Sequence, residues 1–590
     1  MNETLLLEAT IPRTLDAWLA RFEDGSWRGA RVEGWLFEDA AARRAAERRL
    51  AAHGVQASFR SAYKPLLHFF LEEVEMAGLV AVTVRYPVHA QAAPQRFLLE
   101  AYPLAGLWPQ CRFEFVPGGD GLEHEVTLRW QDGREQQARV FAPNRVHTGT
   151  AGSALLSPTG WLRVQRADGS LAGDGAEATD YEQAFARIVE CVERHDWPRG
   201  EPFFKRLDLR VELPGIAQRL ALGHETVSSH EALHEDLYFS LLEVFQRRSG
   251  RAPGDRRLQP GQIVPDVRAG TGPLRLRVAL RGFAPGADAA TPDDDRIPLA
   301  QLARAPAAAR IAREMERLGG ERFTATTRQG RTVLGLYRPG PAAPVLVSGG
   351  QHANETSGIV GALRAAEALQ SASDAHFALI ALENPDGYAL RRELAAWHPE
   401  HMLHAARYTA LGDDLEYREQ APWFEREARR QALALSGAQL HLNLHGYPAH
   451  EWTRPLSGYL PQGFELWTVP KGFFLILRHH RGWQGEARAL LQQVGAALAE
   501  VPGLADFNAR QLALYERHAG GLPFELVHGM ACSVSEVERA DSAPVTLITE
   551  FPDETVHGEA FRFAHTVQMQ AVLAAARAWQ RLARRAWAGR

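Results

Sequence analysis

Two side chains that are able to bind a metal ion follow an apolar segment near the middle of the chain. Residues 345–347 are Val-Leu-Val and lead into Ser-Gly-Gly, and His352 and Glu355 come directly afterwards, three positions apart. An imidazole and a carboxylate at this spacing, where a buried strand changes to a helix, can chelate one Zn²⁺. A His-x-x-Glu pair alone is common, so its meaning depends on the other chemical groups that the chain supplies.

Two later segments supply the other groups that a hydrolytic zinc site needs. Such a site uses three protein ligands and keeps one position open for water. His445, at the end of the alternating segment 441–447, is the third candidate, and His441 is its rival on the same strand face. The apolar segment 545–549 stops at Glu550, a carboxylate suited to move a proton from water to a leaving amine.

These pieces, in this order, resemble the zinc carboxypeptidase family over roughly residue 299 to the C-terminus. That family binds zinc through His-x-x-Glu and a distant His and has a Glu base on a late strand. The Asn-Pro-Asp-Gly sequence at 384–387 matches a family turn. The family places its last ligand at a strand end before a small residue, which favours His445. The resemblance implies a zinc metallopeptidase with an α/β catalytic domain.

An alignment on Gly412 and the Asp-Leu pair that starts at Asp414 adds two roles implied by the resemblance. Arg407 takes the place of the arginine that polarises the scissile carbonyl and stabilises the oxyanion. Arg391 and Arg392 compete with it for this role. Asp414 falls on the carboxylate that orients the first zinc-binding histidine.

The same alignment shows a departure in the predicted substrate-binding residues. Where the family has Asn-Arg to bind a free C-terminal carboxylate, this chain has Glu416 and Tyr417, and Arg418 is displaced by one position. Like charges a few Å apart repel by about 1–4 kcal/mol. Glu416 therefore predicts a substrate with a cationic or amidated end, unless Arg418 reaches the site. Tyr447, just past the third ligand, is a further candidate for the pocket wall.

The first half of the chain contains a second candidate metal-binding motif. Residues 230–234 are His-Glu-Ala-Leu-His, a formal match to the zincin helix. Charged neighbours and Ser229, the expected N-cap, place His230 in an exposed first turn and argue against a second zinc site. The two histidines and three carboxylates on this helix are an alternative contact surface for the catalytic domain or its pocket.

Strands and helices alternate in the C-terminal half, as in βαβ units. The predicted strands are 322–327, 332–337, 344–347, 377–382, 439–444 and 545–549, and the predicted helices are 307–318, 356–369, 424–435, 485–500 and 558–586. The candidate site residues sit at the carboxyl ends of these strands, where open α/β sheets place their sites.

Three domains are predicted. A segment rich in Pro, Gly and Asp at 281–295 is expected to link the two halves, and the Gly-rich segment 166–178 marks a second boundary. We expect an N-terminal α+β domain at 1–165, a second α+β domain at 166–285, and a catalytic domain at 296–590. The fold class of the catalytic domain is α/β, with a mixed β-sheet flanked by helices.

Composition limits the function. The 590 residues are 45% hydrophobic and 23% charged, which is typical of a globular protein. A net charge of −5 and a pI of about 6.6 favour neither nucleic acid nor an anionic membrane as a partner. A basic N-terminal region, a run of about 20 apolar residues and a cysteine framework are all absent from the sequence. These features predict a cytoplasmic location.

The sequence thus predicts a zinc-dependent hydrolase that cleaves a peptide or amide bond by a carboxypeptidase-type mechanism. It would bind one Zn²⁺ per chain, and its substrate would be a peptide or an acylated amino acid. One alternative is a zinc amidase or deacylase that acts on N-acyl amino acids or modified peptides. The other is a non-catalytic binding protein with a retired hydrolase domain.

Overall fold

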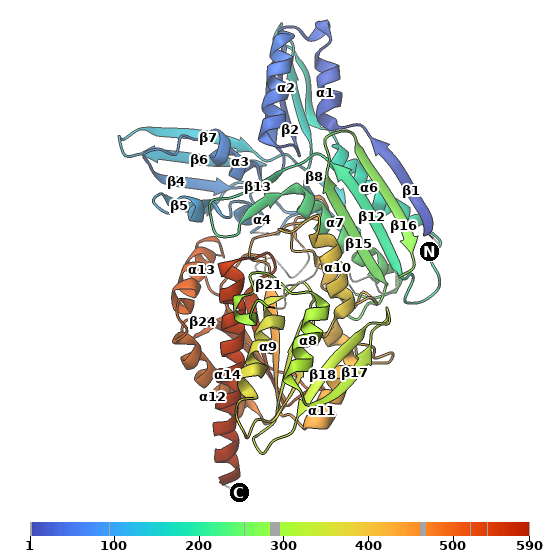
Figure 1. The fold of residues 1–590 in the computed structure, drawn as a ribbon. Coiled ribbons are helices and arrows are strands. Elements are labelled where there is room, and N and C mark those ends of the chain that lie inside the picture. The colour runs from blue at the N-terminus through green and yellow to red at the C-terminus, as the bar shows by residue number, and fades with distance from the viewer. Residues whose placement is uncertain are drawn as a thin grey trace.

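A computed structural model describes residues 3–588 apart from 94, 151, 253, 284–295, 461–467, 520 and 540. In Figure 1 the N-terminal half (blue to green) lies above the C-terminal half (yellow-green to red), and helix α7 (Ser229–Arg248) lies near the junction. The linker predicted at 281–295 falls mostly on residues outside the described part.

The C-terminal half is built on a nine-stranded mixed sheet of order β17-β18-β20-β19-β21-β25-β22-β24-β23. Its strands are β17 (Glu321–Thr326), β18 (Thr332–Arg338), β19 (Val345–Gly349), β20 (Phe377–Ile380), β21 (Leu440–Tyr447), β22 (Phe474–His479), β23 (Glu525–Val527), β24 (Met530–Glu536) and β25 (Val545–Pro552). The central strands β20, β19, β21 and β25 are parallel, and β19 and β21 are buried throughout. Burial of both faces is usual for parallel strands covered by helices.

Helices cover both faces of this sheet. They are α8 (Ala308–Leu318), α9 (Ser357–Leu369), α10 (Pro385–Ala395), α11 (Arg426–Ser436), α12 (Gln484–Ala499), α13 (Leu504–Ala519) and α14 (Glu559–Ala588). One apolar cluster packs α9, α12 and α14 against one face, and a second packs α11 against the other. The predicted α/β fold class is confirmed. None of the described helices combines the length and the apolar character needed to cross a membrane.

The predicted elements of this half all form, with ends that differ by at most three residues. Helices α10 and α13 and the strands β22 to β24 were not predicted from the sequence. The first residues of α10, Asn-Pro-Asp-Gly, predicted a turn and not a helix. They are a helix start: the Asn384 side chain accepts a hydrogen bond from the Gly387 amide at 2.9 Å, and Pro385 is the first helical residue.

The N-terminal half contains three four-stranded sheets among its described residues. The first has the order β1-β16-β12-β15 and the second β11-β10-β2-β3. The third has the order β5-β4-β6-β7, with β4 (Leu79–Tyr86), β5 (Arg112–Pro117), β6 (Glu123–Trp130) and β7 (Glu135–Phe141). The strands of the first two are β1 (Glu3–Ile11), β16 (Leu274–Arg281), β12 (Arg206–Leu213), β15 (Gln262–Ala269), β11 (Leu171–Ala176), β10 (Trp161–Gln165), β2 (Arg31–Leu36) and β3 (Gln56–Ser61). The first and the second sheet each contain strands from segment 1–165 and from segment 166–285. The predicted boundary at 165/166 falls inside the β10–β11 hairpin.

Helix α7 is buried, contrary to the exposed first turn that its sequence predicted. Its N-cap is Ser228, whose side chain accepts a hydrogen bond from the Glu231 amide at 3.1 Å, and His230 is only 5% exposed. The helix packs against β15 and α6 (Asp180–Arg194) on one side and against segments of the C-terminal half on the other. Among the described residues, its two histidines belong to no group that could hold a metal ion. The Nε2 atom of His230 instead lies 3.0 Å from the Leu213 carbonyl oxygen.

The carboxylates of α7 contact the C-terminal half, which is the alternative role predicted for this helix. Both oxygens of Glu231 lie 2.9 Å from His450 Nε2, and Glu231 also accepts from the Met402 amide at 2.9 Å. Asp236 accepts hydrogen bonds from the Leu456 amide and the Ser457 hydroxyl. Buried ionic contacts therefore join the two halves.

We predict that Glu231→Gln lowers the unfolding temperature at pH 6. The difference in unfolding temperature between the variant and the wild type should become smaller at lower pH. Burial raises the pKa of Glu231, but His450 outweighs it and holds the pKa at about 2, against an ordinary value of 4.5. The carboxylate thus stabilises the fold above pH 4.5, by about 3 kcal/mol, and loses this contribution as the pH falls from 4.5 towards 2. Calorimetry at pH 6, 4.5 and 3.5 measures the difference.

The control is Glu190→Gln, which removes a surface ion pair with Arg194. It should leave the unfolding temperature nearly unchanged, because exposed pairs contribute little. A difference between wild type and Glu231→Gln that stays constant across the three pH values would contradict the prediction.

Candidate metal centre

His352, Glu355 and His445 meet at the carboxyl ends of two adjacent strands. His352 and Glu355 lie between β19 and α9, and His445 is near the end of β21, the parallel neighbour of β19. Gly350 turns the chain after β19 with φ at +64°, and a Cβ there would lie 2.8 Å from Leu382 Cδ1. Glycine adopts this backbone conformation without strain, whereas a residue with a side chain would be strained there.

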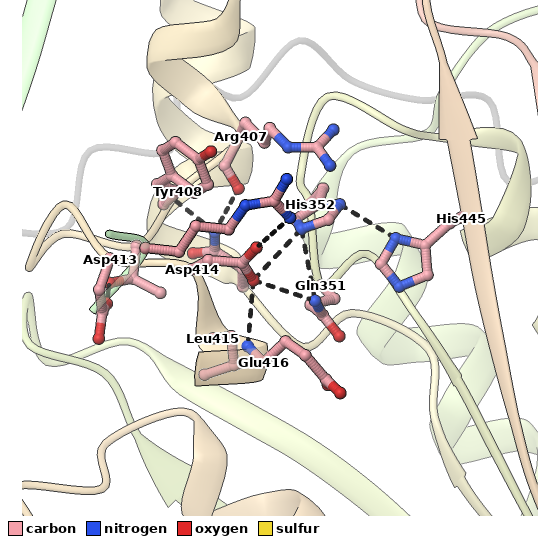
Figure 2. A network of polar contacts seen from close by, with 12 residues as sticks. Gln351, His352, Arg407, Tyr408, Asp413, Asp414, Leu415, Glu416 and His445 are labelled. Carbon is pink, nitrogen blue, oxygen red and sulfur yellow. Dashed lines mark hydrogen bonds and ion pairs between the residues drawn. The ribbon is translucent and has the colours of Figure 1, made fainter. Parts of the chain in front are cut away.

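The ligand atoms of these three side chains converge on one point. His352 Nδ1 lies 2.8 Å from Glu355 Oε1, His445 Nδ1 lies 2.9 Å from Glu355 Oε2, and the two Nδ1 atoms are 3.0 Å apart. All three residues are buried, and their ligand atoms lie within 4.8 Å of one another. Figure 2 shows the two imidazoles facing each other. Two imidazole nitrogens and a carboxylate fit the ligand set of a catalytic zinc site, in both atom type and spacing.

A second carboxylate lies behind His352, at the residue that the resemblance assigned to this place. Asp414 Oδ1 is 3.4 Å from His352 Nε2 and accepts hydrogen bonds from Gln351 Nε2 at 3.3 Å and the Glu416 amide at 3.1 Å (Figure 2). Burial raises the pKa of Asp414, but His352 outweighs burial and holds it far below its usual range. An ionised carboxylate at this position fixes the orientation of the imidazole ring.

Arg407 reaches the same cluster from a separate loop. Its Nη1 donates a hydrogen bond to Glu355. Its backbone is held by Asn384, whose Nδ2 donates to the carbonyl oxygens of Arg407 at 3.4 Å and Tyr408 at 3.1 Å. The Asn-Pro-Asp-Gly motif thus positions the arginine.

A cavity of about 410 Å³ opens above the cluster. His352, His445, Arg407 and Glu550 are among the predicted site residues that line it, whereas the rivals of Arg407 on α10, Arg391 and Arg392, do not. Glu550 comes from β25 and is paired in register with His445 on β21. Burial and the nearby Glu355 raise the pKa of Glu550 well above its usual range. A carboxyl group with a raised pKa is suited to exchange protons with a substrate.

The predicted substrate-binding residues divide into two groups. Glu416, Tyr417 and Tyr447 line the cavity. Arg418 does not, because its guanidinium is buried in hydrogen bonds to Asp413 at 2.6 Å and to Glu425 at 2.7 Å. Arg418 therefore does not replace the arginine of the family.

Glu416 also behaves differently from the sequence prediction. Its carboxylate accepts hydrogen bonds from Arg429 at 2.7 Å and from Arg478 and Arg539 at 2.9 Å each. Burial raises the pKa of Glu416, but these arginines outweigh it and lower the pKa. Arg429 also donates two hydrogen bonds to Glu383. The three arginines still outnumber the two carboxylates, so the charge of Glu416 is compensated. Arg478, on β22, lines the cavity with its side chain 25% exposed.

Several residues of the cavity wall were not predicted from the sequence, and three of them carry a cation, an imidazole or an indole. These three are Arg256, His404 and Trp452. Arg256 comes from the N-terminal half and reaches the cavity through the packing of the two halves, whereas His404 and Trp452 come from connecting segments of the C-terminal half. His404 stands three residues before Arg407, which is the one sequence signal that pointed to it.

Comparisons with known proteins gave no family model and no curated protein that matches the chain. Some solved structures are similar over about half of it. A metallo-carboxypeptidase from Pseudomonas aeruginosa is 17% identical over 52% of this chain and 74% of its own, with a TM-score of 0.29. A metallo-carboxypeptidase from Burkholderia cenocepacia is 13% identical over 52% and 75%, with a TM-score of 0.27. Carboxypeptidase A from Helicoverpa armigera is 11% identical over 55% and 91%, with a TM-score of 0.32.

We predict that the protein binds one Zn²⁺ and that His445→Ala loses it. Asp414→Asn should weaken zinc affinity about 10–100-fold, because the carboxylate that orients His352 is removed. Competition with a chelating dye, together with elemental analysis, measures both effects.

The matched control is His441→Ala, the rival ligand on the same strand. His441 Nε2 lies 2.7 Å from the Ser348 hydroxyl, and the side chain does not line the cavity. This variant should keep its zinc. Loss of zinc from His441→Ala with retention by His445→Ala would refute the assigned ligand set.

Proposed function

We propose that this protein is a zinc-dependent hydrolase that cleaves a peptide or amide bond by a carboxypeptidase-type mechanism. One observation carries the proposal. A buried cluster with the composition of a zinc site, a carboxyl group with a raised pKa and a guanidinium group meet at one cavity. These are the groups that metal-assisted hydrolysis of an amide requires.

The residues of the cavity have separate tasks in the proposed reaction. His352, Glu355 and His445 would hold Zn²⁺, which when bound acts as a Lewis acid on the substrate carbonyl and makes water easier to deprotonate. Glu550 takes a proton from the attacking water and returns it to the leaving nitrogen as the C–N bond breaks. Arg407 donates hydrogen bonds to the carbonyl oxygen as that oxygen gains negative charge.

Apolar side chains strengthen these interactions. Phe474, Ile476 and Ile548 line the cavity on the strands around Glu550. Apolar walls keep the local dielectric constant low, so the hydrogen bonds of Arg407 are worth more than in water. The same surroundings favour the neutral form of Glu550 after it has taken up the proton.

The arginines around Glu416 favour a substrate that has an anionic group. Arg478 and Arg539 are held by Glu416, and Arg478 presents part of its side chain to the cavity. Guanidinium groups bind carboxylates in a bidentate manner. A peptide has such a carboxylate at its C-terminus, and an N-acyl amino acid has one as well. The contact with Arg478 therefore also favours the deacylase alternative. A retired hydrolase domain has less support, because no group of the reaction is missing.

We predict that Glu550→Gln lowers kcat by about 10²–10⁴-fold while zinc content stays the same. The reason is that an amide cannot accept and return the proton. N-benzoylglycyl amino acids with apolar, acidic and basic side chains, together with N-acetyl amino acids, serve as a first panel, with products identified by mass spectrometry. Glu554→Gln is the control, since Glu554 bonds Asn354 outside the cavity and should retain activity within about threefold. Full activity of Glu550→Gln would reject this residue as the base.

We further predict that the wild type prefers N-benzoylglycyl-phenylalanine to its amide and that Arg478→Gln abolishes this preference. Loss of a charge-assisted hydrogen bond costs about 1.5–3 kcal/mol, so KM for the free acid should rise about 10–100-fold. Arg481→Gln is the control, because Arg481 is 85% exposed and lies outside the cavity. A wild type that prefers the amide would restore the repulsion first predicted from Glu416.

A further inference from the structure

The loop that carries Arg407 also brings a histidine to the cavity. His404 begins the short helix η3 (His404–Ala406) and lines the cavity together with His352 and Arg407. Only 5% of His404 is exposed. The proposed mechanism gives His404 no role, although its imidazole borders the space that a substrate would fill.

The His404 ring is held largely by helix α7 of the N-terminal half. Its Nδ1 lies 2.7 Å from Oε2 of Glu235, a fully buried residue near the middle of that helix. The rings of Phe239 and Trp452 pack edge-on against the imidazole, with centroids 5.0 and 4.8 Å away. Phe239 and Trp452 also stack on each other at 5.6 Å. One hydrogen bond and two aromatic contacts thus determine the orientation of the ring.

The second ring nitrogen faces the cavity. Within the described part of the chain no residue bonds Nε2 of His404, and this atom is not among the buried polar atoms that lack a partner. It is therefore accessible from the cavity that His404 lines. Burial raises the pKa of Glu235 to about 8 and lowers that of His404 well below its usual range. Both groups are then mainly neutral near pH 7. A neutral Glu235 donates its O–H to Nδ1, which leaves the proton of the imidazole on Nε2.

We propose that Glu235 is a positioning residue, contributed by the N-terminal half, that holds His404 so that its Nε2–H donates a hydrogen bond to a carbonyl oxygen of the substrate. The identity of the substrate rests on the proposed function, whereas the positioning does not. A purely structural role explains Glu235 poorly. Its Oε1 has no hydrogen-bond partner among the described residues, and a buried carboxyl group stabilises a helix less than an apolar side chain of similar size.

Kinetics of four variants test the proposal. Glu235→Leu and His404→Phe should each raise KM about tenfold for the best substrate of the panel, with kcat within about threefold, because one hydrogen bond to the substrate is lost. Glu235→Gln should stay within about twofold of the wild type, since its amide N–H can also donate to Nδ1. Glu231→Gln is the matched control: it alters a buried carboxylate one turn away that bonds His450, so it should lower the unfolding temperature and leave KM unchanged. An equal rise in KM for Glu231→Gln and Glu235→Leu would show that general loop packing is responsible, and would overturn the proposal.

A second measurement is independent of activity and metal. Histidine ¹⁵N spectra of the chelator-treated protein report the tautomer of each ring, and His404→Gln identifies the His404 signal. We expect the Nε2–H tautomer in the wild type and in Glu235→Gln, a mixture in Glu235→Leu, and a shift of the wild-type Nε2 signal on addition of N-benzoylglycine. An inactive wild type would reject the proposed function alone. An Nδ1–H tautomer in the wild type, or no shift with N-benzoylglycine, would reject the role of His404.

Discussion

The Glu355 carboxylate is the contact on which the rest of the site depends. It interacts with His352, with His445, with Arg407 and with the Gly446 amide at 3.0 Å. These partners come from the end of β19, the end of β21 and the loop after α10, so one side chain joins three separate segments. At 1% exposure the carboxylate would be costly to bury without them. The requirement to compensate this charge therefore determines how closely the strand ends and the loop approach one another.

The same physical rule joins the two halves of the chain. Helix α7 presents Glu231, Glu235 and Asp236 to the C-terminal half, and each finds a polar partner there. Two of these partners lie close in sequence to the site: His404 stands near Arg407, and His450 follows β21 by three residues. A shift of α7 would therefore leave buried carboxyl groups without partners and move the walls of the cavity. This coupling gives the N-terminal half a part in the cavity wall, in line with the contact surface that the sequence offered as an alternative role for this helix.

Features that depend on local sequence patterns could be predicted, whereas features that depend on contacts between distant segments could not. Strands and helices with strong apolar periodicity were placed within three residues, and His352, Glu355, His445 and Glu550 could be brought together because parallel strands end at the same edge of a sheet. The burial of His230 could not be predicted, because charges on a helix indicate exposure until their partners in the other half are known. The inward direction of Arg418 and the arginines around Glu416 depend on contacts between segments that share no motif.

Glu416 and Tyr417, at the positions where the sequence departs from the family that it resembles, affect how a substrate carboxylate would be bound. A lone arginine on a loop would have to be ordered when the substrate arrives. Here Arg478 extends from β22, inside the sheet, and Glu416 already holds its guanidinium at 2.9 Å together with that of Arg539. Groups that are ordered before binding lose less conformational entropy on complex formation. Glu416, which first looked like an obstacle to an anionic substrate, thus acts as the counter-ion that keeps the cationic wall in place.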